Sequence, residues 1–185
     1  MALNADNVRA ALNGKILMAP KGTAAPADLT TPWGTGWVDL GYLDDNGVTM
    51  GYSTGHQDIK AWQSLSPVRK ILNSVDLTLK FVAIELKAAA VSLYFPSSTI
   101  SLVSGSIYRL DIPSAPEPEE WAFGLEWEDG TIVNRMVVPR GEVTDRSDVK
   151  IHRDAVGLEM TVSAYASSSP DIATWLSNDP SWAPS

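Results

Sequence analysis

The chain has 185 residues, of which 44% are hydrophobic and 19% charged, and its formal net charge is -8. This length fits a single core, and the hydrophobic share favours a folded domain over a disordered chain. The negative charge disfavours binding to nucleic-acid phosphates, and the absence of cysteine excludes disulfides, thiolate metal sites and cysteine nucleophiles.

Segments that direct a chain into or across a membrane are missing. The N-terminus has no basic region followed by an apolar region, and no apolar run approaches the roughly 18 residues of a membrane span. We therefore expect a soluble chain with no cleaved secretion signal and no membrane partner.

Turn-forming residue pairs recur along the chain, and short β-patterned runs lie between many of them. The pairs are Asn13-Gly14, Asn46-Gly47, Ser104-Gly105, Asp129-Gly130 and Arg140-Gly141. A mainly β fold is predicted.

Three stretches rich in Pro, Ser, Thr or Ala give no regular pattern: residues 20–36, 113–120 and 167–185. A structureless loop as long as the first is unusual inside a compact domain. It is therefore predicted to be either disordered or ordered on a neighbouring subunit.

The first predicted hairpin covers residues 38–53, with its turn at Asp44-Asp45-Asn46-Gly47. Residues 66–74 are ambiguous, because Ser66-Pro67 could begin a helix. The next run alternates as a strand does, with apolar residues at Val75, Leu77, Leu79 and Phe81.

One helix is predicted from about Ala83, and Pro96 ends it. Its apolar face consists of Ala83, Leu86, Ala90, Leu93 and Tyr94.

The clearest predicted hairpin covers residues 121–138. A two-residue type I′ loop at Asp129-Gly130 places Trp127 opposite Ile132, Phe123 opposite Met136 and Trp121 opposite Val138. On the reverse face Glu126 lies diagonally from Arg135, in a pair worth at most about 1 kcal/mol. A late strand alternates Leu158, Met160, Val162 and Ala164 with polar residues.

Residues able to do chemistry are few, and neither a catalytic, a metal nor a cofactor site is predicted. The two histidines, His56 and His152, have no cysteine partners, so a zinc site would need carboxylates. Glu126 and Glu128 flank Trp127 and could be the carboxylates of a glycosidase, but two acidic residues on one strand face are more simply a solvated surface.

Five of the seven tryptophans are the candidate self-assembly contacts: Trp33, Trp37, Trp62, Trp175 and Trp182. Four of them, all except Trp62, lie in or beside Pro-rich or polar segments. Either these segments fold back onto their own domain, or the rings anchor subunit contacts, where Trp is enriched. Sugar stacking is a third interpretation.

Several segments, in this order, resemble the major tail proteins of long-tailed phages that infect actinobacteria. They are Asn4-Ala-Asp-Asn-Val8, Met18-Ala-Pro-Lys-Gly-Thr23, Trp37-Val-Asp-Leu-Gly-Tyr-Leu-Asp-Asp-Asn-Gly-Val-Thr49 and Ile59-Lys-Ala-Trp-Gln-Ser-Leu-Ser-Pro-Val-Arg69. Residues 76–95 and 157–166 continue the likeness, which covers a domain at residues 1–166. The tail at residues 167–185 does not align.

The resemblance implies a β-sandwich or barrel-like tail tube fold with one flanking α-helix and long loops or arms. It also implies a strand at residues 66–74. The chain would then be a structural protein of a siphovirus-type virion that assembles in the host cytoplasm. It would form hexameric rings, stacked into a tube through which DNA is ejected.

The implied partners are further copies of the chain, a tape-measure protein, and tail terminator and distal tail proteins. DNA would pass through the tube and be repelled by an acidic lumen. The alternative function is a carbohydrate-binding β-sandwich on a virion or cell surface, and a glycosidase comes third.

Overall fold

A computed structural model describes the protein at residues 5–151, 153, 155–168 and 171–183. The fold is mainly β, as the sequence predicts. Its strands are β1 (Asn13–Pro20), β2 (Val38–Asp39), β3 (Leu43–Lys60), β4 (Pro67–Ala83), β5 (Thr99–Ser104), β6 (Ile107–Asp111), β7 (Glu120–Asp129), β8 (Ile132–Arg146), β9 (Leu158–Ala164) and β10 (Thr174–Ser177). Its helices are α1 (Ala88–Tyr94) and the 3-10 helices η1 (Ala5–Asn7) and η2 (Pro180–Trp182).

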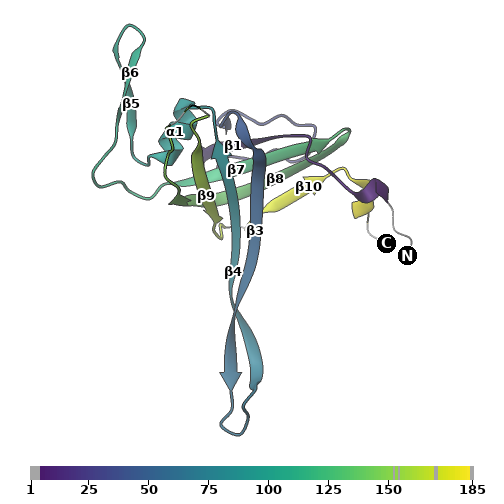
Figure 1. Ribbon diagram of the computed structural model, residues 1–185. Helices are drawn as coiled ribbons and strands as arrows, with labels where there is room; N and C mark the ends of the chain where they lie inside the picture. Colours follow the sequence, from purple (N-terminus) through teal and green to yellow (C-terminus); the bar gives the residue numbers. More distant parts are fainter. Residues whose placement is uncertain (1–4, 152, 154, 169–170, 184–185) are drawn as a thin grey trace.

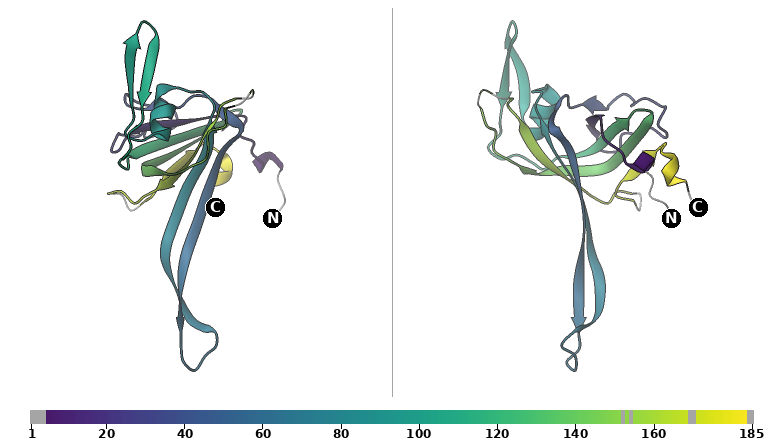
Figure 2. Two further views of the ribbon diagram at one scale, coloured as in Figure 1. Left: turned by 60° about the vertical axis from the view of Figure 1, so that its left-hand side comes forward. Right: turned by 45° about the vertical axis from the view of Figure 1, so that its right-hand side comes forward.

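One antiparallel sheet builds the body of the molecule (Figure 1). Its strand order is β2-β1-β7-β8-β9-β4-β3, with β10 paired to β8 outside this path. β5 and β6 form a separate two-stranded sheet. The β3–β4 hairpin and the shorter β5–β6 hairpin leave the body in opposite directions, as Figures 1 and 2 show.

The core lies on one face of the sheet and is closed by α1. In β9 the buried residues Leu158, Met160 and Val162 alternate with partly exposed ones, which confirms this strand. Three buried residues of α1 join the same cluster. Burial of each large apolar side chain contributes about 1.5–3 kcal/mol, so this face supplies most of the driving force for folding. The arrangement is consistent with the predicted sandwich-like fold.

The centre of the sheet is buried on its reverse face as well. In β1, Ile16 and Met18 belong to the core cluster, while Leu17 and Ala19, which alternate with them, are buried on the other side. Residues 20–36, called the arm below, return over part of this reverse face. The arm is therefore packed on its own chain.

The hairpin at residues 121–138 is confirmed, but its predicted register is wrong by two residues from Phe123 onward and by three at Trp121, where a bulge intervenes. The loop is Gly130-Thr131, and Asp129 pairs with Ile132. Only Gly130 of these two loop residues has a positive φ, at 60°, which is the pattern of a type II′ turn and not of the predicted type I′ turn. A shift by two residues keeps every side chain on its predicted face.

The predicted hairpin at residues 38–53 is wrong. Residues 44–47 lie inside β3, where the five-residue step from Leu43 to Val48 faces a two-residue step in β4. Gly47 has a φ of 63°, so this Asn-Gly pair forms a bulge in one long strand and does not reverse the chain.

The helix exists, but it begins later than predicted. Ala83 is the last residue of β4, where it is fully buried, and Leu86 is 55% exposed. The end before Pro96 is confirmed. The ambiguous residues 66–74 belong to β4 from Pro67 onward, so the strand implied by the resemblance is confirmed there.

The C-terminal stretch contains regular structure that its composition does not predict. β10 pairs with β8 from Thr174, opposite Val137, to Ser177, opposite Asn134. This pairing covers the edge of β8 that β9 leaves open, because β9 pairs only with the later half of β8.

Candidate self-assembly surfaces

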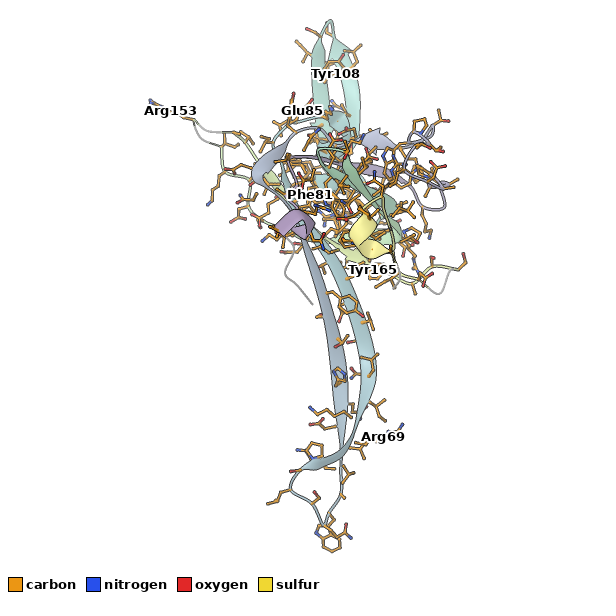
Figure 3. The ribbon with its side chains drawn as sticks, turned by 90° about the vertical axis from the view of Figure 1, so that its right-hand side faces the viewer. Arg69, Phe81, Glu85, Tyr108, Arg153 and Tyr165 are labelled. Carbon is orange, nitrogen blue, oxygen red and sulfur yellow. The ribbon has the colours of Figure 1, made fainter. Side chains whose placement is uncertain are left out.

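The outer part of the β3–β4 hairpin is the most exposed part of the molecule. The first ten residues of β4, from Pro67, are all exposed, and burial begins only at Leu77. In Figure 3 the segment, called the ribbon below, runs from the body near Phe81 to its far end near Arg69. A two-stranded hairpin alone is marginally stable in water, so the ribbon lacks the packing that a third strand or a helix would give.

Large apolar side chains cover the ribbon without burial. Trp62 and Leu65, in the loop between the strands, are 100% and 104% exposed. The others are Tyr52, Ile59, Val68, Ile71, Leu72 and Val75. Exposed large apolar side chains in this number are typical of an interaction site.

The ribbon end has the opposite charge to the chain as a whole. Between residues 56 and 72 the charged residues are Asp58, Lys60, Arg69 and Lys70, three positive and one negative, for a net charge of +2. Lys70 and Asp58 offset each other, because Lys70 Nζ lies 3.8 Å from Asp58 Oδ1.

The β5–β6 hairpin is a second exposed apolar surface. Its exposed large side chains are Ile100, Leu102, Val103, Ile107 and Tyr108. Figure 3 shows Tyr108 on the side of the body opposite Arg69. The charges of its strands cancel, because Arg109 forms an ion pair with Asp111 at 2.9 Å.

A cavity of about 890 Å³ lies where β3 leaves the body, and it is called the root cavity below. Its apolar wall includes Leu43, Val48, Met50, Leu125 and Trp127. Its charged residues are Asp39, Asp44, Asp45 and Glu85 against Lys15 and Lys87, for a net charge of -2. Among the described residues, Asp44 Oδ1 is a buried acceptor without a hydrogen-bond partner.

Trp33, in the arm, and Trp37, directly after it, come together. Their ring centroids are 4.6 Å apart, and the indole Nε1 of Trp37 donates to the carbonyl oxygen of Ala24. The Nε1 of Trp33 donates to Glu126 Oε2 at 3.0 Å. Within the arm, Asp28 accepts backbone N–H bonds from Thr31 and Thr30, which lower its pKa to about 2.

Trp175 and Trp182 come together in the C-terminal stretch. The Trp175 ring lies 4.9 Å from Trp127 and 5.1 Å from Trp182, and its Nε1 donates to Asn134 Oδ1. Both pairs of rings therefore contact their own chain, while Trp62 lies alone at the ribbon end. Trp175 is still 38% exposed despite these contacts.

Arg135 joins the arm to the sheet. The residue is 4% exposed, and its guanidinium bonds to Glu126 Oε2 and donates to the carbonyl oxygens of Asp28 and Thr31 at 2.6 and 2.8 Å. It also lies 4.9 Å from the Trp33 ring centroid. The predicted diagonal pair with Glu126 is instead directly cross-strand and buried, because the register differs by two residues.

Glu126 is placed poorly for the acid of a glycosidase. Burial would raise its pKa, but hydrogen bonds from Lys15 and Arg135 outweigh burial and hold the pKa below its ordinary value. A general acid needs a raised pKa. Glu126 is therefore a structural anion that balances two cations.

Glu120 forms a similar junction at the start of the arm. It accepts from Lys21 Nζ at 2.6 Å and from both Arg140 Nε and Nη2. The hydrogen bonds from Arg140 and Lys21 lower the pKa of Glu120 to about 2.

The described ranges hold no group of three or more His, Cys, Asp or Glu side chains able to bind a metal. His56 is exposed in the ribbon, and His152 lies outside the described residues. Within those ranges no helix is long and apolar enough to cross a membrane.

One family model, described as phage tail tube protein, matches residues 1–185. No curated protein matches the chain.

Proposed function

The chain belongs to the phage tail tube protein family, and from this premise we propose that it polymerises as stacked hexameric rings into the tail tube of a siphovirus-type phage of actinobacteria. As a tail tube protein it is a structural component of the virion. The proposed tube is the conduit for DNA ejection and has no enzymatic role.

The ribbon is the observation that supports polymerisation most directly. It extends two strands and eight large apolar side chains beyond the body, and these side chains are 40–104% exposed. Burial against other copies would supply the missing packing. β10 covers part of the β8 edge, so that strands of other copies do not pair there.

The net charge supports passive conduction of DNA. At -8 per subunit, acidic side chains around a lumen would repel phosphates, so DNA would slide without binding. The remaining proposed partners are a tape-measure protein inside the tube and terminator and distal tail proteins at its ends, and assembly would take place in the host cytoplasm.

Electron microscopy of the purified chain over a range of concentrations tests this function. We expect rings and tubes with six subunits per ring. If particles stay monomeric at every concentration and ionic strength, the chain does not polymerise by itself and the proposal is wrong. Tubes with another number of subunits per ring would correct the stoichiometry alone.

A further inference from the structure

Resting on the proposed polymerisation, we propose that the ribbon end of one copy docks in the root cavity of a second copy. The ribbon end is residues 58–70. The root cavity is the acidic cavity between β1, β3 and β7 that is described above. The contact would be a head-to-tail joint between successive subunits along the tube.

The two surfaces match in apolar character and size. Trp62 and Leu65 are fully exposed and project from the loop at the ribbon end. The root cavity, with about 890 Å³, is in the size range of sites that enclose a compact ligand of several rings. Its wall of Leu125, Trp127 and Val48 provides the apolar surface that these two side chains need.

The two surfaces also have opposite charge. The ribbon end region carries +2 in a chain of -8, while the cavity lining carries -2. Charge complementarity of this kind chooses partners and register more than it adds affinity. The β5–β6 hairpin is apolar enough to compete for the cavity, but the charges of its strands cancel, so the cavity favours the ribbon end.

An unsatisfied atom marks where a cation would bind. Asp44 Oδ2 accepts a hydrogen bond from Asn46, whereas Asp44 Oδ1 is buried with no donor among the described residues. Buried acceptors in native proteins are nearly always paired. A lysine or arginine from an incoming ribbon end would pair with this oxygen once the Asp44 carboxylate turns toward the cavity that it lines.

The geometry requires two copies. The ribbon end and the root cavity lie at opposite ends of the same hairpin, as the positions of Arg69 and Glu85 in Figure 3 show. From Val48 to Lys60, β3 extends at about 3.3 Å per residue, so the joined subunits would be displaced by about 40 Å. Such a joint is heterologous, and it repeats along a stack where the rotation between copies does not close a ring.

Thiol cross-linking tests the joint, because the natural chain has no cysteine. Leu12→Cys lies in the cavity wall and Leu65→Cys at the ribbon end, and both leucines are more than 70% exposed, so neither change disturbs the core. A short bifunctional thiol reagent, added to assembled tubes, should convert the double variant into a ladder of covalent multimers. Each single variant should give dimers at most.

The matched control pairs Leu12→Cys with Ile107→Cys, at the end of the β5–β6 hairpin. A ladder from this control, or assembled tubes of the Leu12/Leu65 variant that yield no ladder, overturns the joint while the proposed function stands. If the wild-type chain forms no rings or tubes, both proposals fall.

Charge reversal gives an independent measurement. Lys60→Glu with Arg69→Glu should raise the subunit concentration needed for assembly by roughly tenfold or more, since like charges would meet at the joint. Adding Asp45→Lys to the same chain should restore part of this loss. Assembly that is unchanged by the first pair of substitutions contradicts the joint.

Discussion

The indole ring of Trp33 lies directly against the Cα atom of Gly124: a Cβ built on Gly124 would fall 2.3 Å from Cη2 of that ring. The contact fixes the arm to the reverse face of β7. Only a residue without a side chain leaves room for the ring there.

Gly124→Ala should therefore destabilise the subunit by about 1–3 kcal/mol, because a rigid indole cannot move without breaking the Trp33 bond to Glu126. Urea unfolding measures the loss. Gly34→Ala, in the same arm with open space around it, is the control and should change the free energy of unfolding far less. Equal effects of the two changes would mean that the Trp33 contact is not tight.

Removal of Arg135 should cost more than removal of an exposed arginine. Arg135→Ala leaves Glu126 with one cation and leaves two arm carbonyl oxygens without their donor, a loss of about 3 kcal/mol. Arg109→Ala removes an exposed ion pair and should cost under about 1 kcal/mol. Unfolding measured at neutral pH compares them, and similar values would show that the buried network contributes nothing special.

Acid should weaken the junction at Glu120. The pKa of this carboxyl is about 2 in the folded chain against 4.5 ordinarily. Its contribution to the free energy of unfolding is therefore complete above about pH 4.5 and is lost as the pH falls to about 2. Glu120→Gln should flatten the pH dependence of unfolding in that range. A variant with the same slope as the wild type would contradict this role.

Deletion of the chain after Ala173 should promote strand association. It removes β10 and uncovers the edge of β8 from Asn134 to Val137. We expect irregular aggregates at concentrations at which the full chain stays dispersed, measured by light scattering. Asp179→Asn is a milder control, since it weakens the bond from Arg9 and keeps β10. A dispersed, folded deletion variant would show that β10 does not protect the edge.

In the free subunit, backbone amides of the ribbon should exchange with solvent faster than those of β9. The ribbon has two strands and exposed side chains, whereas β9 is paired on both edges and buried at alternate positions. Hydrogen exchange followed by mass spectrometry measures the difference. Assembly should then slow exchange in the ribbon. Equal protection in the free subunit would mean that the ribbon is stable alone.

The sequence predicted those elements whose pattern is local. Alternation found β9, the inner part of β4 and the hairpin at residues 121–138, since one face of each packs on the core. It could not fix the register of that hairpin, because Asp129-Gly130 and Gly130-Thr131 both suit a two-residue turn. Asn46-Gly47 likewise permits a turn or a bulge, and only the pairing of β3 with β4 decides.

The candidate contacts could be predicted only in part. Four of the five tryptophans contact their own chain. Composition alone could not predict this, because Gly124, which leaves room for the Trp33 ring, is distant in sequence. Trp62, which is 100% exposed, is the exception. The sequence does not predict the root cavity, since its wall comes from four strands and the loops beside them. Its one local signal, the Asp44-Asp45 pair, is equally typical of a turn.

The bidentate bond from Arg9 to Asp179, at 2.6 and 2.9 Å, holds the two ends of the described chain side by side, as Figure 1 shows. Chains with neighbouring ends tolerate rearrangement of their connectivity. A peptide joining the two ends, with a new opening elsewhere, would keep every strand pairing of the sheet. For the same reason, a cargo fused to either end would emerge from the same place on each subunit.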